Sequence, residues 1–191
     1  GTGIIPLLLY ARENTISADA VEIQPDMADM AARSMAMNGL NEKIRVLPGD
    51  LRSIRTLLPH ARYDLVTCNP PYGKAGGTLL NPDASKRLAR HEESCAIEDV
   101  ACAAAWLLQN GGRLCCVFPA ARMIELSDAM RKYRMAPKRI RMVHSRVEKA
   151  AHLCLMEGML DARPGLIIEP PLVIYDENNA YTPELRRIYG L

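Results

Sequence analysis

A regular alternation of helical and strand-like hydrophobic periods is the feature that most constrains how this chain folds. Apolar residues recur every three or four positions in some segments and form short continuous runs in others. The pattern predicts helices at 4–12, 26–38, about 93–109 and 122–134, and strands at 18–24, 43–47, 63–68, 113–118 and 138–144. Strands that alternate with helices form a parallel sheet covered on both faces. The sequence therefore predicts an α/β fold with a mostly parallel sheet.

The predicted helix over 26–38 has a defined apolar face. Helical spacing places one set of side chains on the same side of it, namely Met27, Met30, Ala31, Ser34 and Met37. Pro25 suits the first turn of this helix and Gly39 its end.

The alternation of helical and strand-like periods stops after Ala151. There, two apolar runs, 152–160 and 166–175, flank a turn signal at 161–165. These runs predict an antiparallel addition at one edge of the sheet. No repeat or low-complexity linker divides the chain, so a single domain over 1–191 is expected. Because Gly1-Thr2-Gly3 lies in the middle of a predicted strand-to-helix turn, we expect the domain to be N-terminally incomplete, with its first strand missing.

Composition excludes several classes of protein. With 49% hydrophobic and 24% charged residues the chain has the balance of a globular domain, and no apolar run approaches the roughly 18–20 residues of a membrane span. A cytoplasmic protein without a membrane partner is expected. The six cysteines show no Cys-x-x-Cys spacing, so we expect no metal site and interpret the thiols as small buried side chains. A catalytic role remains open for Cys68, which adjoins the motif described below.

The basic charge is concentrated in one segment. Residues 131–149 contain eight Lys and Arg residues against the single acid Glu148, although the whole chain carries only +2. Such a segment predicts a nucleic-acid contact, through Arg134, Lys138, Arg139 and Arg141 among others. A solvated helix face followed by a charge-guarded edge strand is the alternative.

The first candidate cofactor contacts are Gly1 and Gly3, because a turn without side chains lets the backbone approach a ligand. The fingerprint of nicotinamide-binding proteins has a small residue at its third glycine position, and Pro6 occupies that position here, which argues against a nicotinamide cofactor. A glycine turn with a purely structural role remains open. Glu22 ends a predicted strand, where a carboxylate can accept hydrogen bonds from both ribose hydroxyls, and Ile23 can pack on an adenine. A solvent-exposed strand end is the alternative for Glu22.

Asp50 follows the next predicted strand, at 43–47, through Pro48-Gly49. Its carboxylate can bind an exocyclic amino group on an adenine, while the amide of Leu51 reaches a ring nitrogen. The alternative is a helix cap. Ligands of open parallel sheets bind at the carboxyl ends of strands, so acids at successive strand ends predict one shared site.

The strongest motif is Asn69-Pro70-Pro71-Tyr72, which follows the predicted strand 63–68. A conjugated amino nitrogen is a poor nucleophile because its lone pair is delocalised. The side-chain oxygen of Asn69 and the carbonyl of Pro70 can accept its two N–H bonds and aim the lone pair at a methyl donor. Tyr72 offers a ring on which a planar substrate stacks. The motif therefore predicts methyl transfer to an amino nitrogen, with the loop 73–90 as a substrate loop.

These residues resemble the class I methyltransferases that carry an Asn-Pro-Pro-Tyr motif, and most closely the bacterial tRNA(Val) adenine-N6 methyltransferase family. The resemblance covers nearly all of the chain, and the segments that carry it are 1–6, 21–24, 69–72, 89–92 and 130–140. It implies a Rossmann-like fold, S-adenosylmethionine as cofactor and a tRNA adenosine beside the anticodon as substrate. It also implies that Gly1, Gly3, Glu22, Ile23, Asp50 and Leu51 contact the cofactor, and that Asn69, Pro70 and Tyr72 contact the methyl acceptor.

Other readings of the same motif remain open. Glutamine-N5 methylation of release factors uses the same tetrapeptide, and methylation of ribosomal RNA guanine or DNA adenine uses related ones. The basic segment favours RNA over a protein loop. A nucleic-acid-binding module with a degenerate cofactor pocket is the non-enzymatic alternative.

Overall fold

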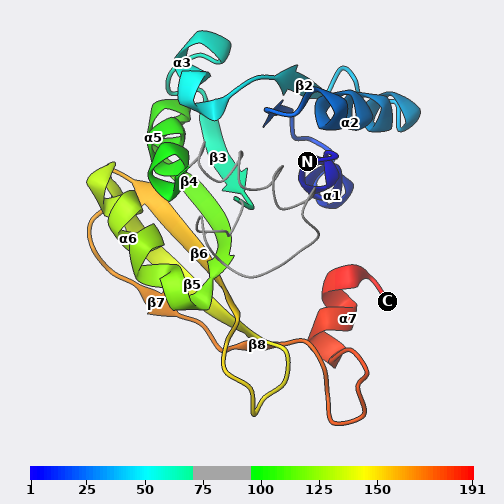
Figure 1. Ribbon diagram of the computed structural model, residues 1–191, viewed down its shortest axis with the longest axis vertical. Helices are drawn as coiled ribbons and strands as arrows, with labels where there is room; N and C mark the ends of the chain where they lie inside the picture. The colour runs from blue at the N-terminus through cyan, green and yellow to red at the C-terminus, as the bar shows by residue number, and fades with distance from the viewer. Residues whose placement is uncertain (71–95) are drawn as a thin grey trace, which may run out of the picture. The chain divides into compact units, whose positions relative to one another are not determined.

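The computed structural model describes residues 1–70 and 96–191. The chain forms two compact units, Gly1–Pro59 and His60–Leu191, which are described in turn (Figure 1). A single domain over 1–191 remains a prediction.

The first unit contains two parallel strands and the helices that flank them. Its elements are α1 (Ile4–Arg12), β1 (Ala18–Glu22), α2 (Pro25–Met37), β2 (Ile44–Pro48), the 3₁₀ turn η1 (Leu51–Ser53) and α3 (Ile54–Leu57). Strands β1 and β2 pair in parallel from Ala18↔Ile44 to Glu22↔Pro48. The predicted strand–helix–strand order is confirmed, with boundaries shifted by one or two residues.

The buried face of α2 differs from the predicted one. Its buried residues are Ala28, Ala31 and Met35, whereas Met37 is 88% exposed. The turn at Gly3 explains the difference, because a Cβ there would lie 2.6 Å from the Met35 side chain and 3.2 Å from Ala31. The side of α2 that carries Ala31 and Met35 packs against this backbone turn, and the absence of a side chain at Gly3 leaves room for the Met35 side chain.

The second unit is built on a six-stranded sheet. Its elements are β3 (Tyr63–Cys68), α5 (Ile97–Leu107), β4 (Leu108–Pro119), η2 (Ala120–Arg122), α6 (Met123–Lys132), β5 (Met135–His144), β6 (Leu153–Leu160), β7 (Ile167–Ile168), β8 (Leu172–Val173) and α7 (Pro183–Tyr189). The strand order is β3-β4-β6-β5-β7, and β8 also pairs with β5. All pairings are parallel except those of β6.

The antiparallel strand is confirmed, but it does not lie at the edge of the sheet. Strand β6 lies between β4 and β5 and pairs antiparallel with both. Glu157 is the only charged residue among its eight positions, and alternate side chains are fully buried, as a central strand requires. The second apolar run, at 166–175, instead forms the short strands β7 and β8, both parallel to β5.

The core of this unit lies between the sheet and the adjacent helices α5 and α6 (Figure 1). The buried side chains of β4 include Leu114 and Phe118, and those of α6 include Leu126 and Met130. Gly158 allows the close packing, because a Cβ there would lie 2.7 Å from the sulfur of Met130. Within 1–70 and 96–191, no helix is long and apolar enough to cross a membrane.

Candidate functional site

Glu22 and Gly1 lie together at the carboxyl end of β1. The Glu22 side chain is only 14% exposed, and its Oε2 contacts the nitrogen of Gly1. Its Oε1 accepts a hydrogen bond from the Gln24 N–H at 2.8 Å. The carboxylate is therefore held in a fixed position beside the glycine turn. Ile23, the next residue, presents an exposed apolar side chain.

Gly3 has a structural role whether or not a ligand binds. It precedes α1 with a φ of 82°, a left-handed conformation that favours glycine. Its missing side chain also makes room for α2, as described above. Gly1 differs, because a Cβ there would meet nothing within 4 Å among the described residues. The two glycines therefore serve the turn in different ways.

Asp50 caps the turn η1, as the alternative interpretation predicted. Its Oδ1 accepts a hydrogen bond from the Arg52 N–H at 2.9 Å, and both oxygens contact the Arg52 guanidinium. These bonds lower the pKa of the Asp50 carboxyl, which therefore remains an anion at neutral pH. Capping fixes the carboxylate beside Leu51, the first residue of η1, and a fixed anion is also suited to binding an amino group.

The two acids belong to one end of the first unit's sheet. Glu22 pairs with Pro48 in the parallel register, and Asp50 lies two residues further along. A hydrogen bond of 2.9 Å from the Gly49 N–H to the Glu22 carbonyl joins the two strand ends. The structure thus brings together Gly1, Glu22 and the Pro48–Asp50 segment, as expected for a ligand site at the carboxyl ends of parallel strands.

Asn69 and Pro70 directly follow β3 in the second unit. Asn69 is exposed at the carboxyl end of the strand, whereas Pro70 is buried. Parallel pairing with β4 continues through Cys68↔Cys116 and holds the backbone in place up to the motif. Asn69 therefore lies at the end of the strands where ligands of open parallel sheets bind. Tyr72 and the loop 73–90 lie outside the described residues.

The prediction of buried thiols is confirmed for Cys116 and Cys154, whereas Cys68, Cys102 and Cys115 are only half-buried. None of these five cysteines forms a disulfide within the described residues. Burial raises the pKa of the Cys115, Cys116 and Cys154 thiols, which makes them poor nucleophiles at neutral pH. Cys68 is half-buried, and a catalytic role for it remains untested.

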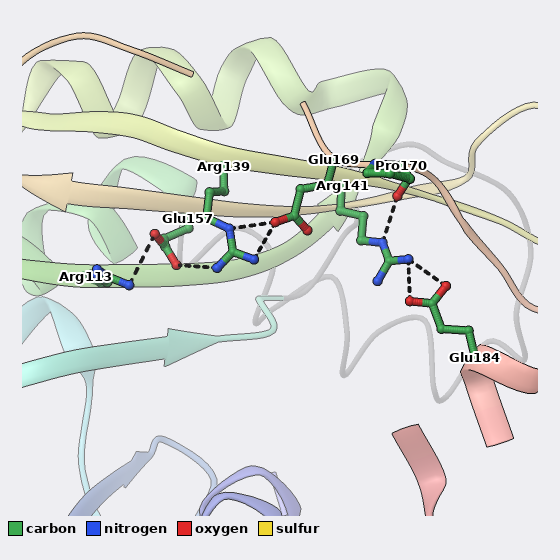
Figure 2. Close-up of polar contacts among 7 residues, drawn as sticks. All are labelled: Arg113, Arg139, Arg141, Glu157, Glu169, Pro170 and Glu184. Carbon is green, nitrogen blue, oxygen red and sulfur yellow. Dashed lines mark hydrogen bonds and ion pairs between the residues drawn. The ribbon is translucent and has the colours of Figure 1, made fainter. Parts of the chain in front are cut away.

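The predicted RNA-contact residues are bound to other groups of the protein, and Figure 2 shows the contacts of two of them, Arg139 and Arg141. Arg134 pairs with Asp161 at 2.5 Å, and Lys138 donates to the Arg163 carbonyl at 3.2 Å. Arg139 lies between Glu157 and Glu169, and Arg141 forms two hydrogen bonds to Glu184 of 2.7 and 2.8 Å. These contacts favour the interpretation that the charges stabilise the sheet and its surroundings.

The carboxylates that neutralise these arginines are functional partners that the sequence analysis missed. Glu157 comes from β6, Glu169 follows β7, and Glu184 lies in the first turn of α7. They are separated from the basic segment in the sequence; strand pairing brings Glu157 and Glu169 next to it, and the position of α7 brings Glu184. The one available signal was an isolated acid in the apolar run 152–160.

Solved structures with a similar architecture identify the fold. A predicted O-methyltransferase from Agrobacterium tumefaciens superposes with a TM-score of 0.81 at 22% identity, over 100% of this chain and 85% of that one. The fibrillarin pre-rRNA processing protein of Methanococcus jannaschii gives 0.58 at 12% identity, over 85% and 64% of the two chains. The fold is therefore the Rossmann-like fold of class I methyltransferases, which confirms the predicted fold class.

Sequence relatives identify the family. The tRNA1(Val) (adenine(37)-N6)-methyltransferase of Porphyromonas gingivalis is 30% identical over 98% of this chain and 74% of its own length. The enzyme of the same name from Tolumonas auensis is 34% identical over 96% of this chain and 75% of its length. No family model matches the chain. The chain belongs to the tRNA1(Val) (adenine(37)-N6)-methyltransferase family and is thus a member of an enzyme family.

Proposed function

We propose that this protein transfers a methyl group from S-adenosylmethionine to the N6 amino nitrogen of an adenosine beside the anticodon of a tRNA. The observation that carries the proposal is the exposed Asn69, followed by Pro70, at the end of a parallel strand in a member of this family. Because its substrate is a tRNA, we place the protein in the cytoplasm. No metal is assigned to the reaction.

The residues of the first unit fit the cofactor chemically. Glu22 supplies a fixed carboxylate that can accept both ribose hydroxyls, and Asp50 supplies a carboxylate for the adenine amino group. The exposed side chain of Ile23 can pack on the adenine, with the amide of Leu51 at a ring nitrogen and the turn Gly1–Gly3 beside the ligand. S-Adenosylmethionine supplies an electrophilic methyl group on a sulfonium.

The acceptor is activated by hydrogen-bond acceptors of the protein. The Asn69 oxygen and the Pro70 carbonyl each accept one N–H of the adenine amino group, which localises the nitrogen lone pair as the nitrogen becomes tetrahedral. Tyr72 is proposed to stack on the base. With S-adenosylmethionine bound, the nitrogen would form its bond to the methyl carbon as the carbon–sulfur bond breaks, the electron pair would stay on the sulfur of the departing S-adenosylhomocysteine, and the nitrogen would then lose a proton to solvent.

The proposal is tested by nucleoside mass spectrometry of tRNA incubated with the full-length protein and S-adenosylmethionine. We expect N6-methyladenosine in the wild-type reaction and none with Asn69→Ala. Methylated glutamine in a release factor, with no change in tRNA, would refute the proposed substrate. Calorimetry without any heat of cofactor binding would indicate a binding module instead.

A further inference from the structure

Three tyrosines at the C-terminal end of the second unit form a row of stacked rings. The rings of Tyr175 and Tyr181 are nearly parallel, at an interplanar angle of 21° and with centroids 5.5 Å apart. Tyr189 extends the row from α7, with its centroid 5.8 Å from that of Tyr181. The three rings are 38%, 38% and 61% exposed. They form a continuous aromatic surface on the outside of the unit.

The row is held rigidly from both sides. Tyr175 and Tyr181 form a β-bridge across a turn, and the carboxylate of Asp176 accepts backbone N–H groups of that turn at 2.9 Å. On the other side, α7 is anchored by the buried Leu185, which packs against Val143 and Leu172. Rigid exposed rings bind a flat ligand with little loss of conformational entropy.

The cations beside the row differ from the arginines of β5. Arg186 is three residues before Tyr189 and therefore neighbours it on the helix surface. Arg186 and Arg187 are exposed, and neither forms an ion pair within the described part of the chain. The arginines of β5, by contrast, are engaged by carboxylates. Phosphates can therefore be bound beside Tyr189 without breaking an existing ion pair.

Acids limit the charge on the other side of the row. A pocket of about 420 Å³ beside Tyr175 is lined by the acids Glu148, Asp176 and Glu177 and by the cation Arg146, which donates a hydrogen bond of 3.2 Å to the Asp176 carbonyl. These carboxylates disfavour a phosphate backbone there, although they do not oppose a neutral base. The row of tyrosines therefore suits a ligand whose flat face stacks on the rings and whose phosphate lies beside α7, away from these carboxylates.

We propose that Tyr175, Tyr181 and Tyr189, with Arg186 and Arg187, form a stacking surface for an unpaired base of the tRNA substrate. The inference rests on the proposed function and adds a second RNA contact outside the reacting site. Unpaired bases offer the flat faces that such a row binds, whereas paired bases are already stacked on their neighbours.

The test compares variants of the intact protein in binding to an unmodified tRNA(Val) transcript. Tyr189→Ala is expected to weaken binding roughly 5- to 10-fold, near the lower end of what one stacked base contributes. Tyr189→Phe keeps the ring and should bind as the wild type does. Leu191→Ala is the matched control, because it removes a 78% exposed apolar side chain that has no ring, and it should change nothing.

Salt dependence separates stacking from charge. Tyr189→Ala should leave the slope of log affinity against log salt unaltered, whereas an Arg186→Ala, Arg187→Ala double variant should make it shallower by about 0.7 per lost contact. If Tyr189→Ala binds the tRNA with wild-type affinity, the proposed stacking surface is refuted. If Tyr189→Ala and Leu191→Ala lose the same affinity for the tRNA, ring stacking is refuted as its source. A shift from dimer to monomer with unchanged tRNA affinity would assign the row to self-association. If the tRNA is methylated while Tyr189→Ala binds normally, only this inference fails.

Discussion

Replacing Arg141 by Ala is expected to destabilise the second unit, because this side chain attaches α7 to the sheet (Figure 2). Its guanidinium forms hydrogen bonds of 2.7 and 2.8 Å to the two oxygens of Glu184, and its Nε donates to the Pro170 carbonyl at 2.9 Å. Arg141 is 20% exposed and Glu184 is 40% exposed. Hydrogen bonds to charged groups contribute about 1.5–3 kcal/mol and fully exposed ion pairs about 0–1 kcal/mol, so we expect a loss of about 1–2 kcal/mol.

The assay is urea denaturation followed by the fluorescence of Trp106, the only tryptophan of the chain and a residue of the same unit. Arg131→Ala is the matched control, because Arg131 is exposed and forms no ion pair among the residues that the structure describes. In a Glu184→Ala background the cost of Arg141→Ala should fall by about 1 kcal/mol. A loss within about 0.3 kcal/mol of the Arg131 control, or no coupling to Glu184, would refute the assigned role.

Three further predictions concern the proposed sites. Glu22→Ala should weaken S-adenosylmethionine binding about tenfold or more in calorimetry, since it removes an acceptor for two ribose hydroxyls, and an unchanged dissociation constant would exclude Glu22 from the site. Asn69→Ala should lower the rate of methyl transfer about 10²–10³-fold with nearly normal cofactor affinity, and retention of half the activity would contradict its role. Gly3→Ala should lower the stability of the first unit by about 1–3 kcal/mol, because the left-handed φ and the contact with Met35 both oppose a Cβ; wild-type stability in urea denaturation would contradict this.

The order and type of the main helices and strands up to β5 followed from the sequence because hydrophobic period is a local property, whereas the C-terminal helix α7 was not predicted. The prediction for the packed face of α2 named Ala31 correctly but missed Ala28 and Met35, because helical spacing alone does not fix which side of a helix turns inward. Ala31 and Met35 are the residues that meet the turn at Gly3. The position of β6 could not be predicted either, since the apolar run that identifies a strand does not identify its neighbours.

The positions of the candidate site residues could be predicted from the sequence because they lie where strands end. Glu22, Asp50 and Asn69 all follow parallel strands, as their positions after apolar runs indicated. The sequence left open whether Asp50 is a cap or a ligand, and the structure confirms the cap while leaving the carboxylate anionic and fixed. The two roles are compatible, because a capping bond orients the group that a ligand would use.

The charge of the basic segment shows why a count along the sequence does not predict an RNA surface. Arg139 and Arg141 pair with acids 30 and 43 positions away, which strand pairing and α7 bring next to β5. Using these arginines for phosphate would leave Glu169 and Glu184 without their partners, so the gain from a phosphate contact is offset by the loss of an existing ion pair. Arg186 and Arg187 form no ion pair within the described residues, so a phosphate contact there breaks none. A cation of this protein should therefore contribute less to RNA affinity where a carboxylate already binds it. The arginines of α7 should contribute more than those of β5.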